Sequence, residues 1–123
     1  MAAVTVASST DFRLEGSHWI TWTPLTSTDL SGSWYPVGKF SDMTVHAYGT
    51  WDGATLILQG SNELGAPASP ITLTDPGMTA ISMTADAMES VMQAPVQFRP
   101  LISGAGAGTS LTISVRMMTS SRR

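Results

Sequence analysis

The side chains of this sequence that could do acid–base chemistry are two histidines and a few carboxylates. Asp42 stands four positions before His46, in a stretch where apolar and polar residues alternate as in an extended strand. Four extended residues span roughly 13 Å, which is too far for the direct hydrogen bond by which an aspartate orients a general base. His18 is remote in the sequence. We therefore interpret His46 as a surface histidine. A small hydrolase remains an alternative only if a distant strand brings an acid to His46.

Two further motifs resemble functional ones but lack essential parts. Asp86 and Glu89 have the spacing of neighbours on one helix face, whereas the paired acids of glycoside hydrolases face each other across a cleft. The segment Gly104–Thr109 is rich in glycine, but it has no lysine of a phosphate-binding loop and lies between two predicted strands. The chain contains no Cys, which excludes zinc sites built on thiolates. We expect no catalytic residue, no metal site and no cofactor, and hence a protein that is not an enzyme.

The composition indicates a soluble β protein with few charges. Charged residues make up 12% of the chain, and polarity comes mainly from 16 Ser and 16 Thr. The only adjacent cations, Arg122 and Arg123, are too few to neutralise a phosphate backbone, so we expect no nucleic-acid partner. No apolar run approaches the ~20 residues of a membrane span, so we expect no membrane partner. Either a surface covered by partner chains or a Thr-rich secreted β domain accounts for this balance.

The elements that must position these side chains are strands. Asp52-Gly53 separates two alternating stretches, 42–51 and 54–60, and predicts a β-hairpin, because both central residues of a type I′ turn need positive φ. The alternation places one set of apolar residues toward the core: Met43, Val45, Ala47, Leu56 and Leu58. Further alternating or β-branched stretches predict strands at 19–23, 34–37, 71–74, 78–84, 96–102 and 109–118.

The number and spacing of these stretches predict an all-β fold. We expect an antiparallel β-sandwich of about eight strands, jelly-roll-like, in one domain over residues 15–118. At most one short helix is expected, near 85–92, where Asp86–Val91 is the only candidate. Residues 1–14 are expected to form an extended N-terminal arm, and residues 119–123 a short basic tail.

Four tryptophans are the most specific candidates for binding. Trp19 and Trp22 have opposite parity in a strand, so one of them should face the core and the other the surface. An exposed tryptophan can stack on a sugar ring, but tryptophan is also enriched in cores and at interface hot spots. We favour the core or interface use and expect partner contacts at Trp19, Trp34, Val4 and Val6.

One resemblance points to a function. The stretch Gly49–Asn62, the turn Leu73-Thr74-Asp75 and the element Arg99–Ser110 together resemble a pattern of small virion proteins of tailed bacteriophages. The likeness extends over about residues 43–118. It implies a structural head-decoration (cement) protein without catalytic residues.

Such a protein would be made in the host cytoplasm. It would sit on the capsid surface of the virion as a homotrimer bound to the major capsid protein. A tail component and a carbohydrate-binding β-sandwich module remain the alternatives.

Overall fold

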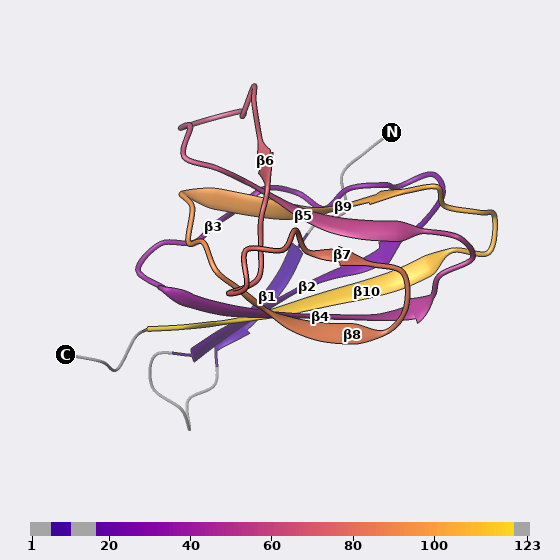
Figure 1. Cartoon of the computed structure of the whole chain (residues 1–123), viewed down its shortest axis with the longest axis horizontal. Helices are drawn as coiled ribbons and strands as arrows, with labels where there is room; N and C mark the ends of the chain where they lie inside the picture. The colour runs from indigo at the N-terminus through magenta and orange to yellow at the C-terminus, as the bar shows by residue number, and fades with distance from the viewer. Residues whose placement is uncertain (1–5, 11–16, 120–123) are drawn as a thin grey trace.

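The computed structural model describes residues 6–10 and 17–119, and this part of the chain contains strands but no helix (Figure 1). The strands are β1 (Val6–Thr10), β2 (Ser17–Leu25), β3 (Tyr35–Pro36), β4 (Asp42–Thr50), β5 (Thr55–Ser61), β6 (Ile71–Thr72), β7 (Ser82–Met83), β8 (Ala87–Val91), β9 (Gln97–Ser103) and β10 (Ser110–Met118). The predicted all-β class is confirmed.

The strands form two antiparallel sheets that face each other (Figure 1). The first sheet has the order β1-β2-β10-β4-β8, and the second has the order β3-β9-β5-β6, with β7 also paired to β5. From β2 onward, the pairs β2–β10 and β4–β8 lie in the first sheet, and β3–β9 and β5–β6 lie in the second. This nested pairing is that of a jelly roll, so the predicted antiparallel sandwich is confirmed together with its jelly-roll character.

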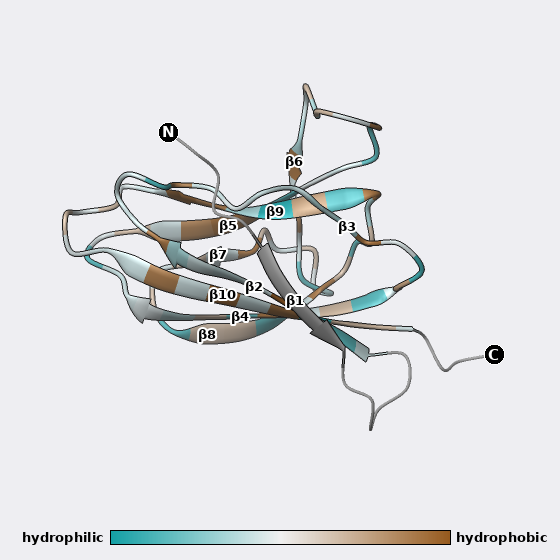
Figure 2. Ribbon diagram, turned by 180° about the vertical axis from the view of Figure 1, so that it is seen from behind, coloured by the Kyte–Doolittle hydropathy of each residue, from teal (hydrophilic) through white to brown (hydrophobic). Residues whose placement is uncertain are grey.

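The core lies between the two sheets and contains the apolar faces that alternation predicted. Met43, Val45 and Ala47 of β4 and Leu56 and Leu58 of β5 are all buried. Figure 2 shows the same alternation of polar and apolar residues along β9. Because successive side chains of a strand point to opposite faces, such a pattern buries one row and leaves the other in solvent.

The predicted β4–β5 hairpin is only half right. Asp52 and Gly53 do have positive φ, at 43° and 87°. However, β4 pairs with β10 and β8, whereas β5 pairs with β9, β6 and β7, so the turn carries the chain from one sheet to the other. Asp52 instead bonds to the loop between β9 and β10, where its carboxylate accepts from the Gly108 N–H at 2.8 Å and its carbonyl from the Gly106 N–H at 3.0 Å. The second loop makes the same crossing between sheets, and the two loops stabilise each other.

The only helix candidate, Asp86–Val91, does not form a helix. Its residues Ala87–Val91 form β8, which pairs with β4 from Met43 to Ala47. A helix of one or two turns is marginal by itself, because the first turn fixes several residues for one hydrogen bond. Pairing with the open edge of β4 instead supplies a full ladder and buries Val91.

The N-terminal segment is partly a strand of the sandwich. Val6–Thr10 pairs antiparallel with β2, from Val6 opposite Trp22 to Thr10 opposite His18. This portion of the arm expected at residues 1–14 is therefore extended but belongs to the first sheet. Val4 lies outside the described residues.

Candidate functional site

The two histidines lie on different parts of the surface and belong to aromatic clusters. His18 Nε2 lies 2.8 Å from the Tyr35 hydroxyl, and its ring stacks on Phe40 at 5.8 Å between centroids. His46 points outward from β4 beside Tyr48, at 4.8 Å between centroids. Among residues 17–119, no three potential metal ligands gather into one group.

The carboxylates hold loops in place. Asp75 accepts the N–H groups of Gly77 and Thr79 at 2.9 and 3.1 Å. Asp86 accepts the Trp51 indole N–H at 2.8 Å, whereas Glu89 lies within β8. Asp86 and Glu89, whose spacing would fit one face of a helix, therefore have different roles, because the segment is not helical.

The described cations stack on aromatic rings. Lys39 lies 5.8 Å from the Phe40 ring centre, Arg99 lies 4.7 Å from Trp34 and Arg116 lies 5.5 Å from Trp19. Such cation–π contacts hold the charge over an apolar surface. The two candidate contact residues Trp19 and Trp34 are thus half-buried under arginines.

The predicted contact residues do not form one surface. Trp19 lies on β2 in the first sheet, whereas Trp34 precedes β3 and stacks on Arg99 of the second sheet. Val6 is in β1. Trp22, which has the opposite parity to Trp19, is buried in the core as expected.

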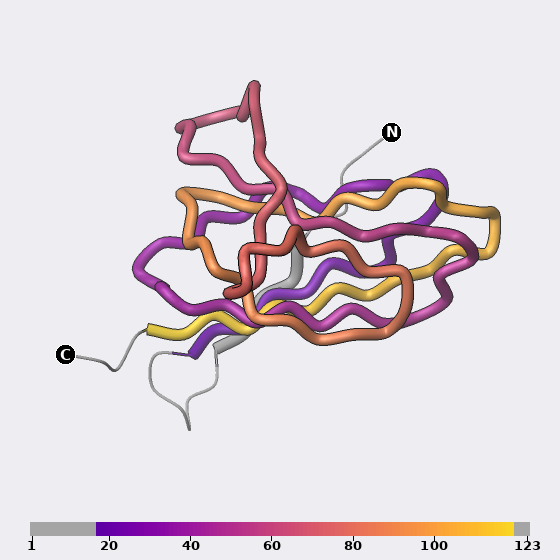
Figure 3. Tube along the Cα trace, in the orientation of Figure 1, coloured from indigo at the N-terminus to yellow at the C-terminus, as the bar shows by residue number. Residues whose placement is uncertain are grey.

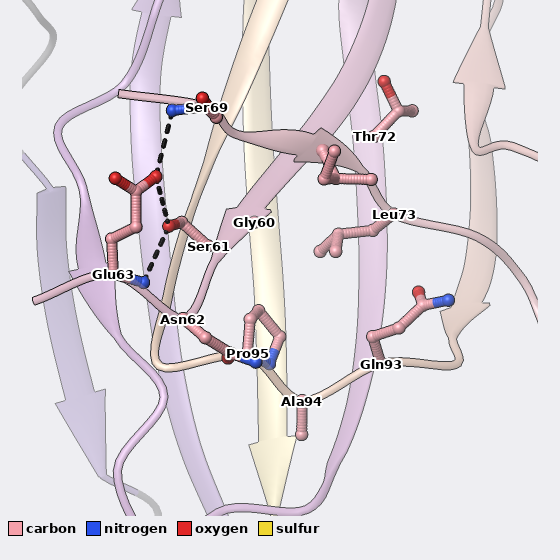
Figure 4. A pocket seen from close by; sticks show the side chains of 11 residues that line it. Gly60, Ser61, Asn62, Glu63, Ser69, Thr72, Leu73, Gln93, Ala94 and Pro95 are labelled. Atoms are coloured by element: carbon pink, nitrogen blue, oxygen red, sulfur yellow. Dashed lines mark hydrogen bonds between the residues drawn. The ribbon is translucent and has the colours of Figure 1, made fainter. Parts of the chain in front are cut away.

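The segment between β5 and β6 projects from the sandwich (Figure 3). A hollow of about 670 Å³ lies beside it, and Figure 4 shows the side chains that line this hollow. Its walls are the end of β5 with residues 61–63, β6 with Leu73, and residues 93–95. Gln93 fixes the last wall, because its side chain accepts from the Thr74 N–H and donates to the Thr74 hydroxyl, both at 2.8 Å. We call this feature the β5–β6 hollow.

Large exposed apolar side chains occur at the hollow or next in sequence to the residues that line it. Ile71 lines the hollow and is 69% exposed, and three neighbours of lining residues are also exposed: Leu64 (86%), Met92 (53%) and Val96 (41%). We call these four residues the apolar rim. Sequence reasoning missed the rim because its members lie in loops and short strands, where no period marks an outward face. The available signal was an isolated Leu64 within a loop of Gly, Ala and Pro.

The loop that carries Leu64 is organised by Glu63 (Figure 4). The Glu63 carboxylate accepts the N–H groups of Ser69 at 2.9 Å and Ala68 at 3.0 Å, and the Ser61 hydroxyl at 3.3 Å. The N–H of Ser69, followed by that of Ala68, lowers the pKa of Glu63 below its usual value of 4.5, because these donors favour the ionised form.

Acid should therefore loosen this loop. A carboxyl group with a lowered folded-state pKa stabilises the fold above its unfolded pKa, and this contribution is lost as pH falls through the folded value. We expect the Ala68 and Ser69 amides to lose hydrogen-exchange protection, relative to intrinsic rates, as the pH falls below 4.5. In Glu63→Gln this protection should be reduced already at neutral pH and should vary little with acid. Equal pH dependence in the two proteins would contradict this role of Glu63.

A smaller pocket of about 320 Å³ opens on the outer face of the first sheet. Its lining residues come from four adjacent strands: Trp19, Thr44, His46, Met88, Ser114 and Arg116. We call it the sheet-face pocket.

Comparisons with family models, curated proteins and solved structures give no match for this chain. Within the described residues, no helix has the length and apolar character that a membrane crossing requires.

Proposed function

We propose that this chain is a non-enzymatic structural protein of a phage virion, which decorates the capsid surface as a homotrimer bound to the major capsid protein. The observation that carries the proposal is the apolar rim, four exposed apolar side chains that line the β5–β6 hollow or follow or precede its lining residues in the sequence. Monomeric proteins rarely leave several large apolar side chains exposed at one place, and such patches typically mark interaction sites. Residues Leu64 and Ile71 would contribute most, because they are the most exposed of the four.

The distribution of charge supports this role. The described carboxylates Asp52, Asp75 and Glu63 accept backbone N–H groups, and the described cations stack on rings. Charged residues make up only 12% of the chain, and a low content of charged residues is typical of the buried centre of an interface. The resemblance of Gly49–Asn62 and Arg99–Ser110 to phage virion proteins supports the choice of partner.

A trimer is compatible with an interface that includes the rim. When two unlike surfaces of identical chains bind each other, the contact repeats around a ring if the rotation closes. The rim of one copy would then cover a different surface of the next copy or of the capsid protein. The burial of apolar area would stabilise the assembly by about 25 cal/mol per Å², less the cost of association.

The direct test combines light scattering of the purified protein with co-sedimentation on shells of the major capsid protein. We expect a trimer that sediments with the shells. The double variant Leu64→Asp, Ile71→Asp should weaken shell binding or trimer formation at least about thirtyfold, as for hot-spot residues that contribute 2 kcal/mol or more.

Met78→Asp is the matched control, because Met78 is 68% exposed but lies in the turn of residues 75–79 and does not line the hollow. It should bind shells as the wild type does. A wild-type monomer that ignores shells would contradict the proposed function, and binding to tail structures instead would favour a tail component. Normal shell binding by the double variant would show that the rim is not part of the interface.

A further inference from the structure

The sheet-face pocket brings together side chains from four neighbouring strands. On β10, Arg116 lies opposite both Trp19 of β2 and Thr44 of β4. In the next row, Ser114 lies opposite His46 of β4, and His46 lies opposite Met88 of β8. Because Val45, Ala47, Ile113 and Val115 between them are buried, these rows face outward. The pocket is therefore built from the rigid centre of the first sheet.

Several polar groups of the pocket have unused hydrogen-bonding capacity. Arg116 Nη2 donates to Ser17 Oγ at 2.9 Å, but its Nε is buried without a hydrogen-bond partner. No carboxylate pairs with Arg116 in the described part of the chain. The hydroxyls of Thr44 and Ser114 likewise have no hydrogen-bond partner among residues 17–119. A positive guanidinium and two free hydroxyls thus line one small space.

We propose that the sheet-face pocket binds an acidic sugar, with the sugar carboxylate on Arg116. The planar fork of a guanidinium matches a carboxylate in shape and charge, and charge-assisted hydrogen bonds are the strong ones. Thr44, Ser114 and His46 are placed to bind ring hydroxyls, and Met88, which is 62% exposed, offers an apolar contact. Few polar groups on a partly apolar wall are typical of a small-ligand site.

The volume of the pocket and the charge of Arg116 together favour an acidic sugar over a neutral sugar or an acidic protein side chain. The volume of about 320 Å³ corresponds to roughly ten water molecules, which is room for a sugar ring and more than a single carboxylate needs. Arg116 covers one face of the Trp19 ring at 5.5 Å, so that face is closed to the stacking by which neutral sugars bind tryptophan. An acidic sugar ring would bind the guanidinium of Arg116 and the hydroxyls of Thr44 and Ser114 and would also fill the pocket. An acidic protein side chain would leave the pocket mostly empty.

The test is calorimetric titration of the full chain with glucuronate and galacturonate oligosaccharides, beside glucose oligosaccharides of equal length. We expect the acidic sugars to bind at least about tenfold more tightly than the neutral ones, and more weakly as salt is added. Arg116→Gln should reduce the affinity at least about tenfold. His46→Ala, at an exposed position, should reduce it without disturbing the fold.

Arg99→Gln is the matched control, because Arg99 makes an equivalent stack with Trp34 on the second sheet. It should bind acidic sugars as the wild type does, and thermal melting should show all three variants folded. Absence of acidic-sugar binding by the wild type, or binding that survives both Arg116→Gln and His46→Ala, overturns the proposal. Equal binding of a polyglutamate peptide with the same dependence on Arg116 overturns the sugar assignment. None of these outcomes depends on capsid binding.

Discussion

Replacing Trp22 by Ala is expected to reduce the free energy of unfolding by about 3–5 kcal/mol, the range for removing a large buried aromatic side chain. Trp22 is fully buried, meets Phe98 edge-on at 5.5 Å between ring centroids, and donates its indole N–H to the Ser33 carbonyl at 3.0 Å. The substitution therefore leaves a cavity between the sheets and an unpaired carbonyl. For a domain of this size, the melting temperature should fall by about 12–19 °C.

The measurement is equilibrium unfolding in urea with thermal melting, and Trp34→Ala is the control. Trp34 is half-buried, stacked on Arg99 outside the core, so its loss should have a much smaller effect. A loss below about 1.5 kcal/mol in Trp22→Ala would show that the core closes around the missing ring, against the tight packing inferred here. The packing is tight on the other side as well, because a Cβ added to Gly32 would lie only 2.4 Å from Trp22 Cδ1.

The second large effect is expected for Gly49→Ala, with a loss of about 3 kcal/mol or more in the free energy of unfolding. Gly49 has a φ of 136°, a conformation that residues with a side chain rarely adopt. A Cβ there would lie 2.3 Å from the Ser110 carbonyl oxygen, which belongs to the backbone of β10. The strand pair β4–β10 would have to separate locally, and the bond from the Gly49 N–H to Asp86 at 3.2 Å would be strained with it.

Gly38→Ala separates the two causes of this effect. Gly38 also has positive φ, at 65°, but nothing lies within 4 Å of an added Cβ. Its substitution should lower the free energy of unfolding by only about 1–2 kcal/mol, the usual cost of a left-handed conformation for a residue with a side chain. Urea unfolding of both variants provides the comparison. Similar losses for the two positions would mean that the approach of β10 to Gly49 contributes nothing.

Local features of the fold were predicted correctly from the sequence, whereas the pairing of distant strands was not. Alternation correctly placed Met43, Val45 and Ala47 in the core and predicted opposite environments for Trp19 and Trp22. The positive φ of Asp52 and Gly53 also followed from residue type. These properties depend on a few neighbouring residues, because side-chain direction in a strand and backbone preference in a turn are local.

The sequence by itself therefore determined the all-β class, the buried faces of the strands and the conformation of the turn. Only the tertiary structure decided that β4 pairs with β10 and β8 instead of β5, and that Ala87–Val91 is a strand. It also decided that Arg116 contacts Trp19, and that Leu64 and Ile71 stay exposed. Several strands with similar alternation could form hydrogen bonds with the same strand edge. Which of them does so depends on the arrangement that buries all the apolar faces at once. That choice is a property of the whole chain, and the pockets on its surface follow from it.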